Sequence, residues 1–199
     1  MPDLPADDLQ VFVFKHRGPL LAIPAALLAI FGKPSAASVT VGLPVAIAGE
    51  LVRCWAVGYS GVTTRGDAVS APELVTAGPY GYVRNPLYVG NFITAAGFAI
   101  AFTGKNSPAA RCAWIAGSLA VMAGVYAVIV PHEERFLRAQ FGEAFERYCE
   151  RVPPVVPQRE PMPDGTGTWQ PSVIKDAESK TFLTFAAMLA ALALKARKS

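Results

Sequence analysis

Long apolar runs separated by short polar stretches dominate the chain. They cover residues 19–31, 39–59, 87–102 and 112–130. A helix needs about 20 apolar residues to cross a hydrocarbon core of ~30 Å, so the second and fourth runs are long enough to span a membrane. The first run is short unless residues 11–14 extend it past the basic cluster that follows them. We therefore predict an all-α fold, a polytopic integral membrane helical bundle with four to five membrane segments.

The polar stretches between these runs predict how the helices are connected. Residues 103–108 read Thr-Gly-Lys-Asn-Ser-Pro, a composition typical of a turn. We expect the runs on either side of it to form an antiparallel helical hairpin. Beyond Pro131, apolar residues recur every three to four positions through 133–151, which predicts an amphipathic helix on or beside the bundle.

The C-terminal part of the chain has a different composition. Residues 152–171 are rich in proline and glycine, which predicts an extended connection. The extra apolar stretch at 181–195 has lysines near both ends and is short for a membrane span. It either packs on the bundle as a tilted helix or lies in the membrane interface. We treat residues 1–199 as a single domain with its core at 19–157.

Composition supports a membrane protein and argues against several other classes. Of the 199 residues, 52% are hydrophobic and 17% charged, which favours a membrane over the cytosol. The formal net charge of +3 is too small to indicate nucleic-acid binding. Cys54, Cys112 and Cys149 lie far apart, without the paired spacing of a zinc site, so we predict no metal centre.

The distribution of lysine and arginine predicts the orientation in the membrane. The N-terminus, the connection at 60–86 and the residues after Pro131 carry more basic residues than the opposite connections. The positive-inside rule assigns this side to the cytoplasm. Residues 1–10 are acidic and lack the features of a secretory signal, so we expect the first apolar run to be retained as a membrane segment.

Residues 78–91 place polar groups directly against an apolar run. The segment contains Tyr80, Tyr82, Arg84, Asn85 and Tyr88. Pro86, which follows Asn85, is well placed to begin a helix. Polar side chains at the end of a membrane helix are costly unless they face protein or a bound polar group, so we predict a binding site here.

A second polar cluster, His132-Glu133-Glu134, lies at the end of the fourth apolar run. Acidic residues there are also typical of a helix N-terminus, whose dipole they complement. Together the two clusters supply acceptors for an ammonium group or ribose hydroxyls, donors for a carboxylate, and aromatic faces for a cation. S-adenosylmethionine bears all of these groups. The Gly-x-Gly-x-x-Gly fingerprint of soluble nucleotide-binding folds is absent from this region.

An ordered set of motifs resembles a known family. Residues 74–90 are followed by Glu133-Glu134-x-x-Leu137, then Phe141-Gly142, Tyr148 and Arg151-Val152-Pro153. This pattern, over roughly the middle two-thirds of the chain, resembles the isoprenylcysteine carboxyl methyltransferase family, and the related phospholipid N-methyltransferases share much of it. The resemblance implies transfer of a methyl group from S-adenosyl-L-methionine to a lipophilic acceptor, a lipid or isoprenoid-type molecule, at the cytoplasmic end of the bundle.

The resemblance also implies roles for individual residues. The candidates for catalysis are Arg84, Glu133 and Glu134. The candidates for cofactor binding are Arg65, Glu73, Leu74, Val75, Tyr80, Asn85, Pro86, Leu87, Tyr88 and Glu133. Among these, Tyr80 is expected to pack on the cofactor, residues 85–88 to hold its amino-acid end, and Glu133 to bind its ammonium or ribose hydroxyls.

The chain departs from the family pattern at two positions. Asn85 stands where the family usually has histidine; an amide still donates a hydrogen bond but cannot act as a base. Ile129 stands near the point where the carboxyl-methylating members have a basic residue, which weakens the case for an anionic acceptor. Elsewhere, Glu50 and Arg53 lie three apart on one helical face, and we expect them to pair with each other.

Two alternatives remain open. A membrane reductase using a nicotinamide cofactor would resemble this family in fold, with Arg84, Arg147 and Arg151 available for the phosphates; Glu133 would be a poor neighbour for them. A non-catalytic membrane protein retaining the fold is the other alternative. The sequence does not specify the acceptor or the oligomeric state.

Overall fold

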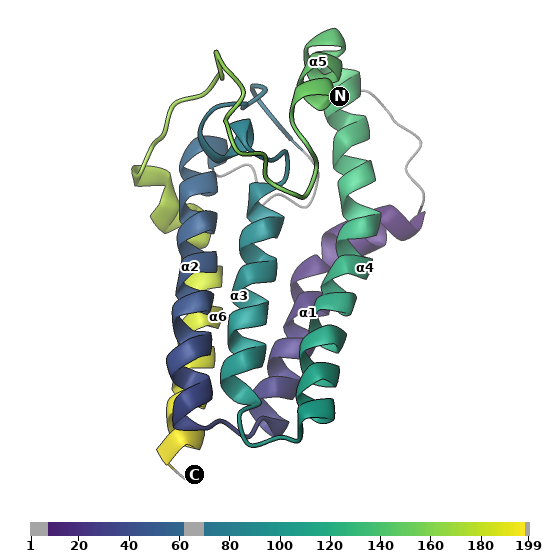
Figure 1. Cartoon of the computed structure of the whole chain (residues 1–199). Coiled ribbons are helices and arrows are strands. Elements are labelled where there is room, and N and C mark those ends of the chain that lie inside the picture. Colours follow the sequence, from purple (N-terminus) through teal and green to yellow (C-terminus); the bar gives the residue numbers. More distant parts are fainter. Residues whose placement is uncertain (1–7, 62–69, 198–199) are drawn as a thin grey trace.

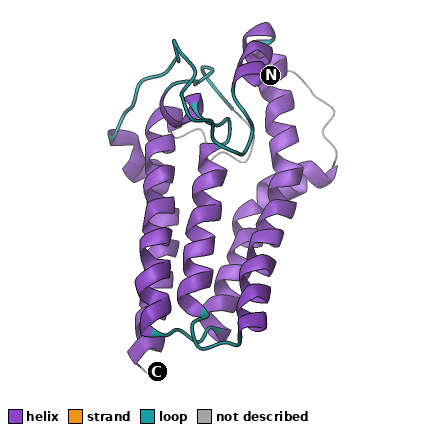
Figure 2. Ribbon diagram, viewed as in Figure 1, coloured by secondary structure: helices purple, strands orange, loops and turns teal. Residues whose placement is uncertain are grey.

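The computed structural model of the chain describes residues 8–61 and 70–197. These residues form α1 (Asp8–Phe31), α2 (Ala36–Ser60), the 3-10 turn η2 (Gly78–Gly81), α3 (Pro86–Phe102), α4 (Pro108–Phe141), α5 (Glu143–Arg151) and α6 (Ser172–Arg197). The described residues contain no strand (Figure 2). The helices α1, α2, α4 and α6 are long and apolar enough to cross a membrane, and α3 is a shorter apolar helix of 17 residues. The predicted polytopic helical membrane bundle is confirmed.

The first helix is longer than its main apolar run. α1 begins at Asp8 and continues through the basic cluster, so residues 11–14 do extend the segment. The Arg17 side chain folds back along the helix, where it donates to the Phe14 carbonyl at 2.6 Å and places its guanidinium over the Phe14 ring. Figure 1 shows the first turns at an angle to the rest of the helix, consistent with Pro19 and Pro24 inside it.

The helices α2 and α3 pack most closely, through small residues. A Cβ on Gly97 would lie 2.2 Å from the Ala46 backbone nitrogen, and one on Gly42 would lie 2.4 Å from the Gly97 carbonyl oxygen. In a membrane, where lipid tails are as apolar as leucine, such close backbone approach is a main source of helix association. This packing fixes the position of α3, and therefore of the polar segment that precedes it.

The two ends of the bundle differ. At one end, short connections tie α1–α2 to α3–α4: Lys33 N–H donates to the Phe102 carbonyl and Lys105 N–H to the Lys33 carbonyl. At the other end lie η2, α5 and the connection at 152–171 (Figure 1). The hairpin of α3 and α4 predicted from the turn at 103–108 is present. The sequence-predicted site residues that the structure describes belong to the loop-rich end.

The segment after Pro131 differs from its prediction. A single amphipathic helix over 133–151 was expected, but α4 continues through Pro131 to Phe141 and a separate α5 follows. The break lies at Gly142, whose φ of +51° belongs to the left-handed region that favours glycine. Because α4 continues, Glu133 and Glu134 lie inside a helix rather than at a helix N-terminus.

The C-terminal apolar stretch packs on the bundle rather than lying in the interface. α6 contacts α2 most extensively, and its Met188 and Leu192 are buried in one cluster with Leu28 and Phe102. It begins at the loop-rich end and runs to the opposite end, where Lys195 Nζ donates to the Ile30 carbonyl at 2.9 Å. The expectation that everything after Pro131 lies on one membrane side is therefore wrong for the end of α6.

Candidate functional site

A cavity of about 790 Å³ opens at the loop-rich end of the bundle. This volume lies within the range of about 300–1,000 Å³ typical of small-molecule sites. Helices α1, α2, α3, α4, α5 and α6 contribute to its wall, together with η2 and residues 70–75. The sequence-predicted residues that line it are Glu73, Leu74, Val75, Tyr80, Arg84, Asn85, Pro86, Leu87, Tyr88 and Glu133. Arg65 lies outside the described residues, and Glu134 is not part of the lining.

Tyr88 and Glu133 form the polar inner wall of the cavity. Pro86 is the first residue of α3, and Tyr88 follows two residues later in the first turn, where its side chain contacts α4. The Tyr88 hydroxyl donates to Glu133 Oε1 at 2.7 Å. The Tyr88 ring also stacks on Tyr126 of α4, with ring centroids 4.2 Å apart. The carboxylate is thus held in a fixed place in the cavity wall.

Arg84 holds the loop-rich end together. Its Nε and Nη2 donate to Glu134 Oε1 at 3.0 and 2.9 Å, and its Nη1 donates to the carbonyls of Cys149 and Val152 at 3.2 and 2.7 Å. A guanidinium that bonds one carboxylate and two carbonyls joins α4 to α5 and to the segment that follows. Arg84 and Glu134, two of the candidates for catalysis, are therefore brought together, in an arrangement suited to positioning.

Asn85 makes a similar link. Its Nδ2 donates to the Pro154 carbonyl at 2.9 Å, which leaves one amide N–H and the amide oxygen for other partners. Asn85 is also the N-cap of α3, but its side chain does not cap the helix. The N–H groups of Tyr88 and Val89 donate to the Asn85 carbonyl, so the N–H that this uncapped helix end offers at the cavity wall is that of Leu87.

Tyr80 of η2 and Tyr148 of α5 line the cavity side by side. The Tyr148 hydroxyl donates to the Tyr80 carbonyl at 2.8 Å. Burial raises the pKa of Tyr80 to about 12, and a hydrogen bond with Ser60 offsets this only in part. Burial likewise raises the pKa of Tyr148, and next to it that of the Cys149 thiol. All three groups are neutral at physiological pH, so they contribute packing and hydrogen bonds rather than charge.

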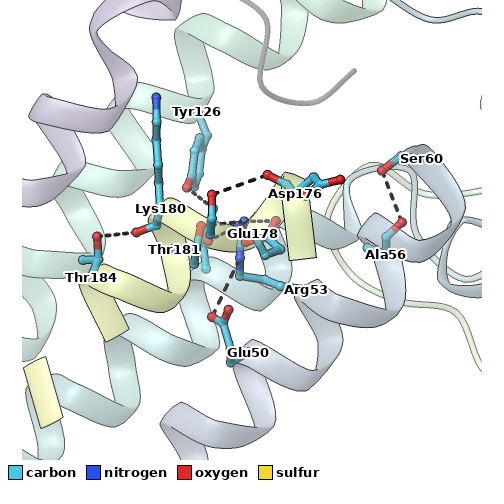
Figure 3. A network of polar contacts seen from close by, with 12 residues as sticks. Glu50, Arg53, Ala56, Ser60, Tyr126, Asp176, Glu178, Lys180, Thr181 and Thr184 are labelled. Atoms are coloured by element: carbon cyan, nitrogen blue, oxygen red, sulfur yellow. Dashed lines mark hydrogen bonds and ion pairs between the residues drawn. The ribbon is translucent and has the colours of Figure 1, made fainter. Parts of the chain in front are cut away.

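The structure adds a polar group that sequence reasoning did not place in the site. Arg53, Asn91 and Tyr126 line the membrane-embedded part of the cavity. The predicted pair of Arg53 with Glu50 is present, with Nε and Oε2 3.9 Å apart. A closer partner is Glu178 on α6, whose two oxygens accept from Arg53 Nη2 at 2.8 and 2.9 Å (Figure 3). The charge at position 53, within an apolar run, was the only signal in the sequence.

Comparison with known proteins identifies the family. Residues 37–144, which span α2 through the start of α5, match the family described as Phospholipid methyltransferase. The chain belongs to this family. The resemblance drawn from residues 74–90 and the motifs after Glu133 is confirmed at that level, and the protein is an integral membrane protein of a methyltransferase family.

Two curated relatives are similar over part of their length. The nickel-cobalt-cadmium resistance protein NccN of Alcaligenes xylosoxydans xylosoxydans is 34% identical over 124 residues, 62% of this chain and 52% of the relative. The cobalt-zinc-cadmium resistance protein CzcN of Cupriavidus metallidurans is 35% identical over 96 residues, 48% of this chain and 40% of the relative. The chain thus spans about half of the length of the first relative and less of the second. No solved structure matches.

Proposed function

We propose that this protein is an S-adenosyl-L-methionine-dependent methyltransferase that acts on a lipophilic, membrane-embedded acceptor, a lipid or isoprenoid-type molecule. The observation that carries the proposal is the Tyr88–Glu133 pair in the wall of a large cavity that is lined by most of the residues predicted for the site. The cavity connects the loop-rich end of the bundle with its apolar interior.

The residues present fit S-adenosylmethionine. Glu133 offers a carboxylate for the ammonium group or the ribose hydroxyls. The rings of Tyr80, Tyr88 and Tyr126 offer aromatic faces, which attract a sulfonium cation. The uncapped N-terminus of α3 at Leu87 and the remaining N–H of Asn85 are suited to a carboxylate.

The cofactor supplies a methyl group on a sulfonium, which is already activated for transfer. The chain then needs to orient the two reactants and keep water away, and orientation alone is worth about 7–11 kcal/mol in favourable cases. The rigid contacts of Tyr88, Arg84 and Tyr148 serve this orientation. We assign no strong base to the site, since Glu133 bonds Tyr88 and Glu134 bonds Arg84.

The acceptor site lies on the membrane side of the same cavity. Leu21, Ala22 and Ala25 of α1 line it there, and they provide a wall suited to an apolar chain. We propose that the acceptor reaches this wall from the bilayer and that the loop-rich end faces the cytoplasm. Basic residues support this orientation: Lys15, Arg84, Arg138 and Arg147 all belong to that end of the bundle.

The test is methyl transfer by the purified protein. Detergent-solubilised or bilayer-reconstituted protein is incubated with methyl-labelled S-adenosylmethionine and a total lipid extract, and the labelled fraction is identified. We expect label in an extractable lipophilic product and far less of it with Glu133→Ala. Binding of a reduced nicotinamide together with no binding of S-adenosylhomocysteine, the demethylated product, would support a reductase instead. Absence of binding by either ligand would support a non-catalytic protein.

A further inference from the structure

A buried ion pair connects the C-terminal helix to the cavity wall. Glu178 of α6 is 0% exposed, and both its oxygens accept from Arg53 Nη2 of α2. Thr181, one turn further along α6, lies 3.5 Å from the same nitrogen. Figure 3 shows Glu178 and Glu50 reaching Arg53 from two different helices. A charge pair inside a membrane bundle is costly to form, which makes it a feature that requires an explanation.

The contacts continue from Arg53 toward the proposed cofactor site. Arg53 Nη1 donates to Asn91 Oδ1, and this contact fixes which way the amide faces. The amide nitrogen of Asn91 then donates to the Tyr126 hydroxyl at 2.6 Å. The Tyr126 ring stacks on Tyr88. An unbroken series of contacts therefore runs from α6 through α2, α3 and α4 to Tyr88.

The series ends at the carboxylate that we place in contact with the cofactor, because the Tyr88 hydroxyl donates to Glu133. Of the members, Arg53, Asn91, Tyr126, Tyr88 and Glu133 all line the cavity, whereas Glu178 does not. The contact that joins Glu178 to the lining residues is its ion pair with Arg53. Glu178 also lies outside residues 37–144, the part of the chain that matches the family.

We propose that Glu178 is a positioning residue for the cofactor site, acting through Arg53, Asn91 and Tyr126 on the Tyr88–Glu133 pair. This inference rests on the proposed function, because it concerns the same cavity. Its physical basis is charge compensation. Without the Glu178 carboxylate, the buried Arg53 guanidinium loses its closest charged partner. Its orientation is then no longer fixed by that ion pair. The helix α6 is then part of the site and more than a support for the bundle.

Calorimetric titration of the full-length protein with S-adenosylhomocysteine tests this proposal. We expect Glu178→Gln, which keeps the shape but removes the charge, to weaken binding by roughly two- to a hundred-and-fiftyfold, the range of coupling between residues in one network. Asp176→Asn is the matched control, since Asp176 lies two residues away on α6 and is exposed. It should bind like the wild type. Glu178→Asp should recover part of the lost affinity because it restores the charge.

A second variant separates positioning from stability. Asn91→Ala breaks the series while leaving the Arg53–Glu178 pair intact, and it should weaken binding to a similar degree even if Glu178→Gln does not fold. Combining Asn91→Ala with Tyr88→Phe should add little to the larger single effect. Fully additive losses, or Asn91→Ala and Glu178→Gln binding like the wild type, would overturn the positioning role alone. A wild-type protein that binds no S-adenosylhomocysteine would overturn the proposed function as well.

Discussion

Tyr88 and Glu133 are 45 positions apart in the chain, and the Tyr88 hydroxyl donates to Glu133 Oε1 at 2.7 Å. The contact joins α3 to α4 in the wall of the cavity. Other contacts fix both side chains: the Tyr88 ring stacks on Tyr126, and Glu133 lies inside the continuous helix α4. The pair is the part of the site in which family motif and geometry agree most closely.

Removing the carboxylate should cost more binding energy than removing the phenol. Hydrogen bonds to charged groups contribute about 1.5–3 kcal/mol, so Glu133→Ala should weaken S-adenosylhomocysteine binding by about ten- to a hundredfold. Tyr88→Phe leaves the carboxylate in place and should weaken it by about two- to tenfold. Titration calorimetry measures both. Tyr82→Phe, in the same segment but outside the cavity lining, is the control. Equal binding by Glu133→Ala and Tyr82→Phe would contradict the site assignment.

Arg84→Lys should destabilise the loop-rich end. Lysine keeps the charge but cannot bond Glu134 and the carbonyls of Cys149 and Val152 together. We expect a loss of about 2–4 kcal/mol of unfolding free energy, measured by thermal or denaturant unfolding in detergent, because one carboxylate and two carbonyls lose a partner. Limited proteolysis should cut the connection at 152–171 faster.

The control for this variant is another arginine near the same end. Arg147 pairs with Glu143 one turn away on α5, and its side chain is 61% exposed. Exposed pairs of this kind contribute about 0.3–0.5 kcal/mol, so Arg147→Lys should unfold almost like the wild type. If Arg84→Lys were as stable as Arg147→Lys, the proposed role of Arg84 in holding the loop-rich end together would be wrong.

The two adjacent glutamates show what the sequence was able to predict and what it was not. Both were candidates for the site, because both follow the fourth apolar run. Successive residues on a helix point about 100° apart, since 3.6 residues make one turn, so the two carboxylates face different neighbours. Only the packing of α4 against α3 decides which one enters the cavity. In the structure, Glu133 accepts a hydrogen bond from Tyr88, and Glu134 accepts from Arg84.

The ion pair of Arg53 with Glu178 was beyond sequence reasoning for a different reason. The residues lie 125 positions apart, and helical spacing relates only positions three or four apart. The local partner Glu50 was predicted for that reason, and the pair is present at 3.9 Å. The membrane helices themselves were predicted well, because length and apolar composition determine them. The break at Gly142 was missed because the apolar period continues across it.

Gly97→Ala should destabilise the bundle although it adds a single methyl group. The new Cβ would lie 2.2 Å from the Ala46 nitrogen and 2.7 Å from the Gly42 carbonyl oxygen, and neither backbone can move without separating α2 from α3. Overpacking of this kind costs about 1–3 kcal/mol. Gly124→Ala is the control, because its Cβ would meet nothing within 4 Å. Unfolding in detergent measures both, and equal stability of the two variants would contradict the close packing.

Asn85→His restores the residue usual in the family, and its effect on binding should depend on pH. An imidazole N–H can replace the amide as donor to the Pro154 carbonyl, so the fold should tolerate the change. Histidine has an ordinary pKa of about 6.5, so the new side chain is increasingly charged as the pH falls through that value. A positive charge at this position would attract the carboxylate of a bound S-adenosylhomocysteine. We expect the affinity of the variant, relative to the wild type, to rise as the pH falls from about 7.5 to 5.5.

Asn85→Gln supplies the uncharged control at each pH. Parallel pH profiles for the variant and the wild type would mean that residue 85 does not face the amino-acid end of the cofactor.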